Sequence, residues 1–382
     1  MLDFTLTDKR ISELCAKNCF PSAQLCVMHH GEIVHEFTVG RPDPNQSWKC
    51  DNETRYDVAS LSKLFAGSAF LALCDKGIFS LDELVCESFP QFTGMREIRA
   101  SANALVANAG ASDEILGYAD AGKVTWYNIL VHNAGLGWIQ LQNACKTPDE
   151  VVDKICSMPF AYQTGSTVLY TDLGLILMGI AMERRCGKPL DVLLDELVCQ
   201  PLGLTNTGYN RVSQGAKTEN TAPTEFCAWR DMRVHGLVHD ENSYFMDGVA
   251  GHAGVFSCAR EVAKLGEGYL AALKGREGAF LPKETVEKYI QFQQMNRWDR
   301  RGIMFQLRII QSDAHTFPLG RNTFGHTGFT GTCMWVDPDR DMVFALLTND
   351  VYAGRACRTL GSVRKSIVEE IVCAIDLEEM GR

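Results

Sequence analysis

Two residues in the stretch DVASLSKLFAGSAFLALCDKG, which begins at Asp57, could form a nucleophile and its base. Ser60 and Lys63 are three positions apart, and this spacing places both side chains on one face of a helix, whereas Ser62 and Lys63 are adjacent and diverge. A serine hydroxyl becomes a useful nucleophile when a base takes its proton. A lysine can be that base if burial or neighbouring charge lowers its pKa. The pair would support acyl transfer through an acyl-serine.

The same spacing occurs a second time, so spacing alone does not identify a nucleophile. Ser362 and Lys365 are also three positions apart, in SVRK, which has the pattern of a solvated helix face. An exposed lysine keeps its proton. The apolar residues around Ser60 and Lys63 therefore favour the first pair.

Three other segments place polar side chains beside glycines or ahead of an apolar helix. Tyr170 could relay a proton, or it could pack at the edge of the helix that Asp172 caps. His326 and Thr327 lie among glycines at the edge of a predicted strand, where glycine often marks the close approach of a ligand. A tight hairpin would have the same pattern. His252, in GVAGHAGVFS, is either a ligand contact or a structural residue.

Competing chemistries and partners lack their sequence patterns. The chain has no G-x-S-x-G, H-E-x-x-H, P-loop or G-x-G-x-x-G motif, and the histidines at 29, 30 and 35 match no zinc pattern. We therefore expect no metal and no cofactor. The net charge of −10 without a Lys/Arg run argues against nucleic acid and anionic membranes, and no apolar run reaches the roughly 18 residues of a membrane span.

The cysteine pattern predicts a reducing compartment. Fifteen cysteines are scattered through the sequence without a C-x-x-C pair. The N-terminal residues show no basic start followed by an apolar run, so no signal peptide is expected. We accordingly predict a cytoplasmic protein with free thiols.

Hydrophobic periodicity predicts an α/β (α+β) fold with two parts. The elements expected are a helix from Thr7, its N-cap, to Asn18; a β-hairpin over 23–40; a helix over 60–75; helical segments over 81–206; strands over 302–310, 330–337 and 341–349; and a last helix over 360–375. The N- and C-terminal strands should share one antiparallel sheet flanked by helices. We expect residues 1–80 and 210–382 to form a sheet subdomain, residues 81–209 a mostly helical one, and the active site to lie between them.

In this order, the segments resemble the serine β-lactamase and penicillin-binding-protein superfamily. The branch in question includes class C β-lactamases, D-alanyl-D-alanine carboxypeptidases and family VIII-type esterases. DVASLSKLF matches the Ser-x-x-Lys element, YTDLGLILMG the Tyr-x-Asn element, and FGHTGFTG lies where the family has Lys-Thr-Gly or His-Thr-Gly. The resemblance runs over nearly the whole chain. It implies a β-lactamase/transpeptidase-like fold.

The resemblance also implies roles for the matching residues. Ser60 would be the acylated nucleophile, and Lys63 and Tyr170 would share the proton transfer. The backbone N–H groups of Ser60 and Phe329 would form the oxyanion hole. The substrate contacts would be Asp172, His326, Thr327, Gly328 and His252.

Two departures from the family pattern bear on the substrate. Asp172 replaces the usual asparagine; an ionised carboxylate cannot donate a hydrogen bond, and it could pair with Lys63 and raise the pKa of that lysine. His326 replaces a lysine and is mostly neutral near pH 7, so anchoring of a substrate carboxylate should be weaker.

These departures predict a hydrolase of small esters or amides, with esterase, amidase or D-amino-acid peptidase character, rather than a strong β-lactamase. Two alternatives stay open. The protein could be a slow-turnover or non-catalytic binding protein of the penicillin-binding type, or a transesterase with the same nucleophile. The sequence does not predict an oligomeric state.

Overall fold

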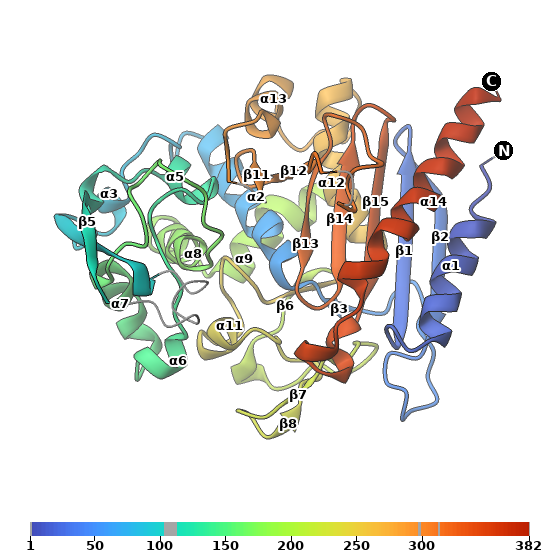
Figure 1. Ribbon diagram of the computed structural model, residues 1–382, viewed down its shortest axis with the longest axis horizontal. Helices are drawn as coiled ribbons and strands as arrows, with labels where there is room; N and C mark the ends of the chain where they lie inside the picture. The colour runs from blue at the N-terminus through green and yellow to red at the C-terminus, as the bar shows by residue number, and fades with distance from the viewer. Residues whose placement is uncertain (1, 103–112, 297–298, 312–313, 382) are drawn as a thin grey trace.

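A large antiparallel sheet organises the chain. The computed structural model describes residues 2–102, 113–296, 299–311 and 314–381. In that part of the chain the large sheet has eight strands, in the order β10-β11-β12-β13-β14-β15-β1-β2. Strand β1 from the N-terminus lies between β15 and β2, so the blue strands stand beside the red ones in Figure 1. The predicted sheet of N- and C-terminal strands is confirmed.

The strands of this sheet have the following bounds: β1 Ser22–His29, β2 Glu32–Gly40, β10 Gln294–Met295, β11 Arg300–Arg301, β12 Gln306–Leu307, β13 Phe324–Gly328, β14 Thr332–Asp337 and β15 Met342–Thr348. A smaller sheet contains β3 Tyr56–Asp57, β9 Val255–Ser257 and β6 Gly208–Tyr209. The helices are α1 Thr5–Ala16, α2 Ser62–Asp75, α3 Val85–Ser88, α5 Trp126–Leu130, α6 Leu141–Ala144, α7 Val151–Ser157, α8 Leu173–Cys186, α9 Leu190–Leu194, α10 Gln200–Leu202, α11 Glu241–Phe245, α12 Ala259–Lys274, α13 Lys283–Ile290 and α14 Leu360–Met380.

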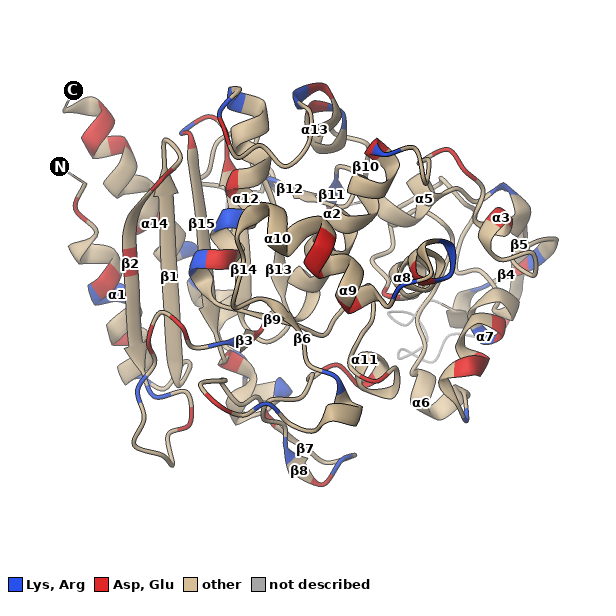
Figure 2. Cartoon of the chain, turned by 180° about the vertical axis from the view of Figure 1, so that it is seen from behind, with Lys and Arg blue, Asp and Glu red and all other residues tan. Residues whose placement is uncertain are grey.

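The large sheet is buried on both faces. Leu25 and Val27 of β1 pack in a cluster with α1 and α14, whereas Cys26 and Met28 belong to the core that includes α12 and α2. A strand covered on both sides needs apolar residues at every position, which is why β1 and β15 lack an alternating pattern. In the view from behind, β1 carries no charged residue along its length (Figure 2).

Helix α2 lies between the sheet and the helical part of the chain (Figure 1). Its residues from Ser62 to Leu73 are all buried. A helix that is apolar all round is stable only when other elements surround it. The helix predicted over 60–75 is therefore confirmed in position, although its first residues form a 3₁₀ turn, Ala59–Leu61, ahead of the α-helix.

Several local predictions are wrong in detail. Helix α1 begins at Thr5, whose N–H donates to the Asp3 carboxylate at 2.9 Å, so Thr7 is a buried residue of the first turn and not the cap. The segment over 81–206 includes a two-stranded sheet, β4 Met95–Arg99 with β5 Ile115–Asp120. Residues 103–112 of the alanine-rich stretch lie outside the described residues. The strand predicted over 302–310 is reduced to β12, because Met304 has a φ of 73°.

Other features bear on the remaining predictions. All fifteen cysteines are free, in agreement with the expected absence of a disulfide framework. No helix within the described ranges is long and apolar enough to cross a membrane. The division into subdomains at residues 80 and 210 stays a prediction.

The loop before β9 lies against α8 without space for side chains between them. A Cβ atom on Gly251 would collide with the carbonyl oxygen of Leu175 in α8, and one on Gly179 would lie 3.1 Å from the backbone nitrogen of Gly251. This close approach brings the segment that contains His252 beside the residues that precede α8.

Gly251→Ala should lower the free energy of unfolding by about 1–3 kcal/mol, since backbone atoms must move to admit the new methyl group. Gly361→Ala is the matched control: a Cβ atom there meets nothing within 4 Å, and alanine is the better helix former. Its stability should be unchanged or slightly higher. Urea denaturation followed by circular dichroism measures both values. Equal stabilities of the two variants would contradict the close approach.

Candidate active site

A strained turn holds Ser60 at the start of α2. Ala59 has a φ of 48°, which is unusual for a residue with a side chain. The buried Asp57 carboxylate accepts the Ala59 N–H at 2.8 Å and the His239 N–H at 2.6 Å. Burial raises the pKa of Asp57 despite these bonds. An interior carboxylate thus fixes the turn that carries the candidate nucleophile, and the sequence analysis did not single it out.

Strand β13 ends directly against this turn. A Cβ atom on Gly328 would lie 2.5 Å from the carbonyl oxygen of Val58, so glycine is required for this approach. The Thr330 hydroxyl donates to the carbonyl oxygen of Asp57 at 2.7 Å, and the Thr332 hydroxyl donates to that of Val58 at 3.0 Å. These contacts place the backbone that follows Gly328 beside the Ser60 turn.

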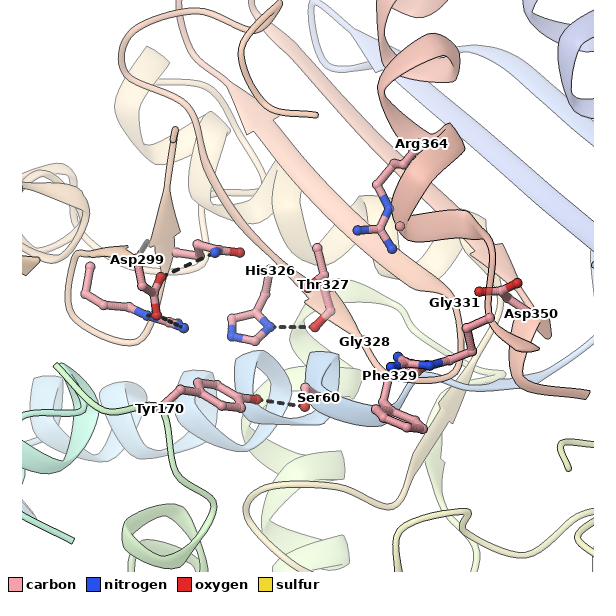
Figure 3. A pocket seen from close by; sticks show the side chains of 14 residues that line it. Ser60, Tyr170, Asp299, His326, Thr327, Gly328, Phe329, Gly331, Asp350 and Arg364 are labelled. Atoms are coloured by element: carbon pink, nitrogen blue, oxygen red, sulfur yellow. Dashed lines mark hydrogen bonds and ion pairs between the residues drawn. The ribbon is translucent and has the colours of Figure 1, made fainter. Parts of the chain in front are cut away.

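The predicted catalytic side chains converge on the Ser60 hydroxyl. Tyr170 donates from its phenol to Ser60 Oγ at 2.7 Å, as Figure 3 shows, and Lys63 Nζ donates to the same atom at 3.1 Å. Lys63 Nζ also lies 2.8 Å from Asp172 Oδ1 and donates to the carbonyl oxygen of His252 at 3.1 Å. Only 2% of Lys63 is exposed. Residues from three distant segments therefore meet at one buried ammonium group.

The charge state of Lys63 is set by competing effects. Burial lowers the pKa of Lys63, but the Asp172 carboxylate and Tyr170 outweigh it and hold the pKa above the usual lysine value. Asp172 occupies the N-cap position of α8, yet its carboxylate makes no capping hydrogen bond. It pairs with Lys63 instead. The pairing considered from the sequence is thus present, and it opposes a neutral lysine base.

The Tyr170 phenol is neutral in this environment. Burial raises the pKa of Tyr170, and the Lys63 cation only partly opposes this effect. The ring lies close to cationic and imidazole groups: Lys63 Nζ is 4.8 Å from its centroid, the Arg301 guanidinium carbon is 5.1 Å away, and the His132 ring centroid is 4.8 Å away. The phenol can therefore exchange protons without first becoming an anion.

The two predicted histidines have different environments. His326 Nδ1 lies 2.7 Å from the Thr327 carbonyl oxygen, so Nδ1 carries the proton and the buried Nε2 is an acceptor without a partner in the described part of the chain. Burial, followed by Arg301 and Lys63, lowers the pKa of His326 well below its usual value, in agreement with the neutral imidazole expected. His252 Nε2 lies 2.8 Å from Asp240 Oδ1.

Three arginines that were not singled out from the sequence, Arg301, Arg358 and Arg364, line the cavity beside Ser60. It has a volume of about 440 Å³, and its lining includes Ser60, His326 and Thr327 together with Arg301 and Arg364. SVRK was interpreted as a solvated face, and this is wrong for Arg364, which is buried. The signal was available, because Arg364 shares the helical spacing of the buried residues Leu360, Ile367 and Ile371. The arginines offer other cations to a substrate carboxylate, so a neutral His326 does not by itself imply weak anchoring of that carboxylate.

Comparison with known proteins identifies the family. The chain belongs to the Beta-lactamase family, whose model matches residues 7–365, and it is a serine hydrolase related to β-lactamases. N-acetylmuramyl-L-alanine amidase of Bacillus subtilis (strain 168) is 28% identical over 363 residues, covering 86% of this chain and 77% of the relative. A putative D-alanyl-D-alanine carboxypeptidase of Escherichia coli (strain K12) is 27% identical over 362 residues, covering 86% and 78%.

Solved structures show the same fold. EstCE1, a hydrolase with promiscuous acyltransferase activity, superposes with a TM-score of 0.70 at 18% identity and covers 96% of this chain and 98% of its own. A penicillin-binding-protein homologue from Caulobacter crescentus gives the same TM-score and identity, with 97% of each chain covered. The predicted β-lactamase/transpeptidase-like fold is confirmed.

The buried pair of Lys63 and Asp172 leads to a prediction on stability. Asp172→Asn should lower the free energy of unfolding at neutral pH by about 3 kcal/mol, because it leaves a buried ammonium without its counter-charge. The double variant Lys63→Met with Asp172→Asn should recover most of this loss. Urea denaturation of the two single variants and the double variant measures the coupling. A loss in the double variant equal to the sum of the two single losses would show that the two charges do not interact.

The same pair predicts opposite pH dependences. In the wild type the pKa of Lys63 is raised in the folded state, so the folded state binds the Lys63 proton more tightly than the unfolded state does. The stability that Lys63 contributes is therefore fully present below its pKa in the unfolded state, and it is lost as the pH rises through its pKa in the folded state. In the Asp172→Asn variant the burial of Lys63 dominates and lowers the pKa of that lysine in the folded state. The stability of that variant should then rise from neutral pH toward about 10, the ordinary lysine pKa.

Proposed function

We propose that the protein hydrolyses small amides or esters through an acyl-serine intermediate on Ser60. The observation that carries this proposal is the pair of hydrogen bonds to Ser60 Oγ, from Tyr170 at 2.7 Å and from Lys63 at 3.1 Å. The two other serines considered from the sequence, Ser62 and Ser362, are less suitable. The Oγ of Ser62 accepts the Val255 N–H at 3.0 Å, and Ser362 is exposed. The intact set around Ser60 disfavours a non-catalytic binding protein.

Tyr170 is the group that would move the proton. Because Lys63 is protonated, it cannot accept the Ser60 proton, but its charge stabilises negative charge that develops on either oxygen. As Ser60 Oγ attacks the carbonyl carbon, the Ser60 proton passes to the Tyr170 oxygen, and the Tyr170 proton passes to the leaving nitrogen or oxygen. Water then attacks the ester: its proton goes to Tyr170, and the Tyr170 proton returns to Ser60 Oγ. Each step leaves Tyr170 neutral.

The oxyanion of each step would be held by backbone N–H groups. The Ser60 N–H belongs to the turn ahead of α2, and the Phe329 N–H follows Gly328 at the end of β13. The position of Phe329 is restrained from the other side, because Arg358 Nη1 donates to its carbonyl oxygen at 3.1 Å. Donors that are fixed before the reaction stabilise the tetrahedral intermediate without reorganisation.

The relatives favour an amide as the substrate. Two of them carry the names N-acetylmuramyl-L-alanine amidase and putative D-alanyl-D-alanine carboxypeptidase, and both names describe cleavage of amide bonds. We therefore place amidase or peptidase activity ahead of esterase activity, and we expect small activated esters to serve as convenient substrates of the same nucleophile.

A fluorophosphonate probe should label Ser60, and a p-nitrophenyl ester should be hydrolysed by the wild type. Ser60→Ala should reduce turnover to background because no acyl-enzyme can form. Tyr170→Phe should lower kcat about 100- to 10,000-fold, the usual range for loss of a general acid–base. Peptide mass spectrometry locates the adduct, and steady-state kinetics measures turnover.

Ser362→Ala is the matched control, since Ser362 has the same spacing to a lysine but is exposed. Its activity should equal that of the wild type. An adduct on another serine, or full activity in Ser60→Ala, would rule out the proposed nucleophile.

A further inference from the structure

The cleft consists of two cavities that meet at Ser60. Ser60, Tyr170 and Phe329 line both of them. The first cavity, of about 440 Å³, extends along β13 to α14, and the second, of about 230 Å³, extends to α11 and the loop of His252. The candidate nucleophile thus lies at the boundary between two binding spaces, one for each side of a scissile bond.

The first cavity contains Arg301, which pairs with a carboxylate, and Arg364, which has no ion pair among the described residues. Arg301 binds Asp299 through Nε at 2.8 Å and Nη2 at 2.6 Å, which leaves its buried Nη1 without a hydrogen-bond partner. Arg364 is 7% exposed and forms no hydrogen bond or ion pair with another described residue. Figure 3 shows its guanidinium directed from α14 toward the space above Thr327 and Gly328.

The carboxylates of the first cavity do not neutralise Arg364. Asp299 is engaged by Arg301, and Asp350 accepts the backbone N–H groups of Thr359 at 2.9 Å and Leu360 at 3.1 Å. A buried guanidinium without a partner is unfavourable until an anion reaches it. The planar guanidinium groups suit a carboxylate, which can accept two parallel hydrogen bonds.

Three carboxylates line the second cavity, together with the cations Lys63 and Arg355. Its lining contains Asp172, Asp240 and Glu241. Asp172 is paired with Lys63, and Glu241 Oε1 with Arg355. The Oδ1 atom of Asp240 accepts from Ser243 N–H and lies 2.8 Å from His252 Nε2. The other oxygens of Asp240 and Glu241 have no hydrogen-bond partner among the described residues, so both can still accept.

A second observation indicates that a donor belongs in this cavity. His252 also lines it, is 1% exposed, and has a buried Nδ1 to which no described residue forms a hydrogen bond. When the ring carries its one proton on Nε2, which faces a carboxylate, Nδ1 is an acceptor. The indole of Trp138, 45% exposed, lines the same space and offers a face for a cation or an apolar side chain. Hydrogen-bond acceptors that still lack a donor, beside the face of an aromatic ring, suit the binding of an ammonium group.

We propose that the cleft selects a short unblocked peptide, with its α-ammonium group in the second cavity and its carboxylate in the first. Such a peptide carries one cation and one anion on opposite sides of the scissile amide. Two extended residues span at most about 7 Å, so both charged groups of such a peptide must lie close to the boundary that the two cavities share at Ser60. This inference rests on the proposed function and adds the substrate class to it.

The chemical step follows from this placement. Ser60 Oγ forms an ester with the carbonyl carbon of the amino-terminal residue, and the C–N bond breaks. The leaving amine, whose carboxylate is held by Arg301 and Arg364, takes its proton from Tyr170. Water then hydrolyses the ester and releases the first amino acid.

The test uses four substrates with the same scissile amide: a free dipeptide, its N-acetyl form, its C-terminal amide, and the doubly blocked form, each as the L,L and D,D isomers. In the wild type, blocking either end should lower kcat/KM at least about tenfold, the effect expected when a charged partner is lost. Arg364→Met should penalise the free-carboxylate substrates at least about tenfold more than the amidated ones. Glu241→Gln should lower kcat/KM at least about tenfold more for the free-amine substrates than for the N-acetylated ones.

Lys365→Met is the control, since this neighbouring cation pairs with Glu369 on the outer part of α14. It should not change the preference for any substrate. Should Arg364→Met fail to fold, inhibition of ester hydrolysis by the four peptides in the wild type gives the same answer. The free dipeptide should be the tightest inhibitor of the four.

Several outcomes would overturn the inference. If Ser60 is acylated and esters are hydrolysed, but blocked and free peptides are cleaved equally well or not at all, the proposed function stands and the substrate class is wrong. If no probe acylates Ser60, both fail. Asp172, Asp240 and His252 have donor atoms within 4.8 Å of one another, so a metal ion is the competing cation. Loss of peptide cleavage in EDTA, with ester hydrolysis intact, would assign the second cavity to that ion.

Discussion

The ammonium group of Lys63 is the point on which the arrangement of this site depends. A buried cation is stable only when carboxylate and carbonyl oxygens surround it. Here those oxygens come from Asp172, at the start of α8, and from His252, on the loop before β9. The lysine itself belongs to α2. One charge therefore joins three segments that are distant in the sequence, and the serine hydroxyl lies within its reach.

The exchange of asparagine for aspartate in the Tyr-x-Asn element changes the chemistry of the lysine more than the shape of the site. With a carboxylate at position 172, Lys63 stays protonated and serves as a fixed positive charge. In the proposed mechanism the proton transfers then fall to Tyr170, which burial keeps neutral. The two residues that share acid–base chemistry in the family resemblance are in this way assigned separate tasks.

Much of the fold could be predicted from the sequence, because its signals are local. The hairpin around Gly31, the apolar helix after Ser60 and the strands before and after Pro338 are each set by short-range patterns. The order of three motifs was enough to bring Ser60, Tyr170 and His326 together. Predictions from local patterns are wrong or incomplete where the surrounding structure determines the environment of a residue. Thr7 lies inside the first turn of α1, whose N-cap is Phe4, and Arg364 is buried beside a cavity that residues of other segments complete. Asp57 was missed because nothing in the sequence indicates that its carboxylate faces two N–H groups.

The position of β1 within the sheet has a consequence for the biosynthesis of the protein. Ala23 pairs with Thr348, more than 300 residues later, so one side of the N-terminal hairpin stays unsatisfied until nearly the whole chain has left the ribosome. Until then an apolar edge strand is available for pairing with other chains. Such long-range closure makes folding slow. The turn of Ser60 packs against β13, near the same late-arriving strands, so the nucleophile reaches its final geometry only when the last part of the sheet is in place. An unfinished chain accordingly lacks the assembled site.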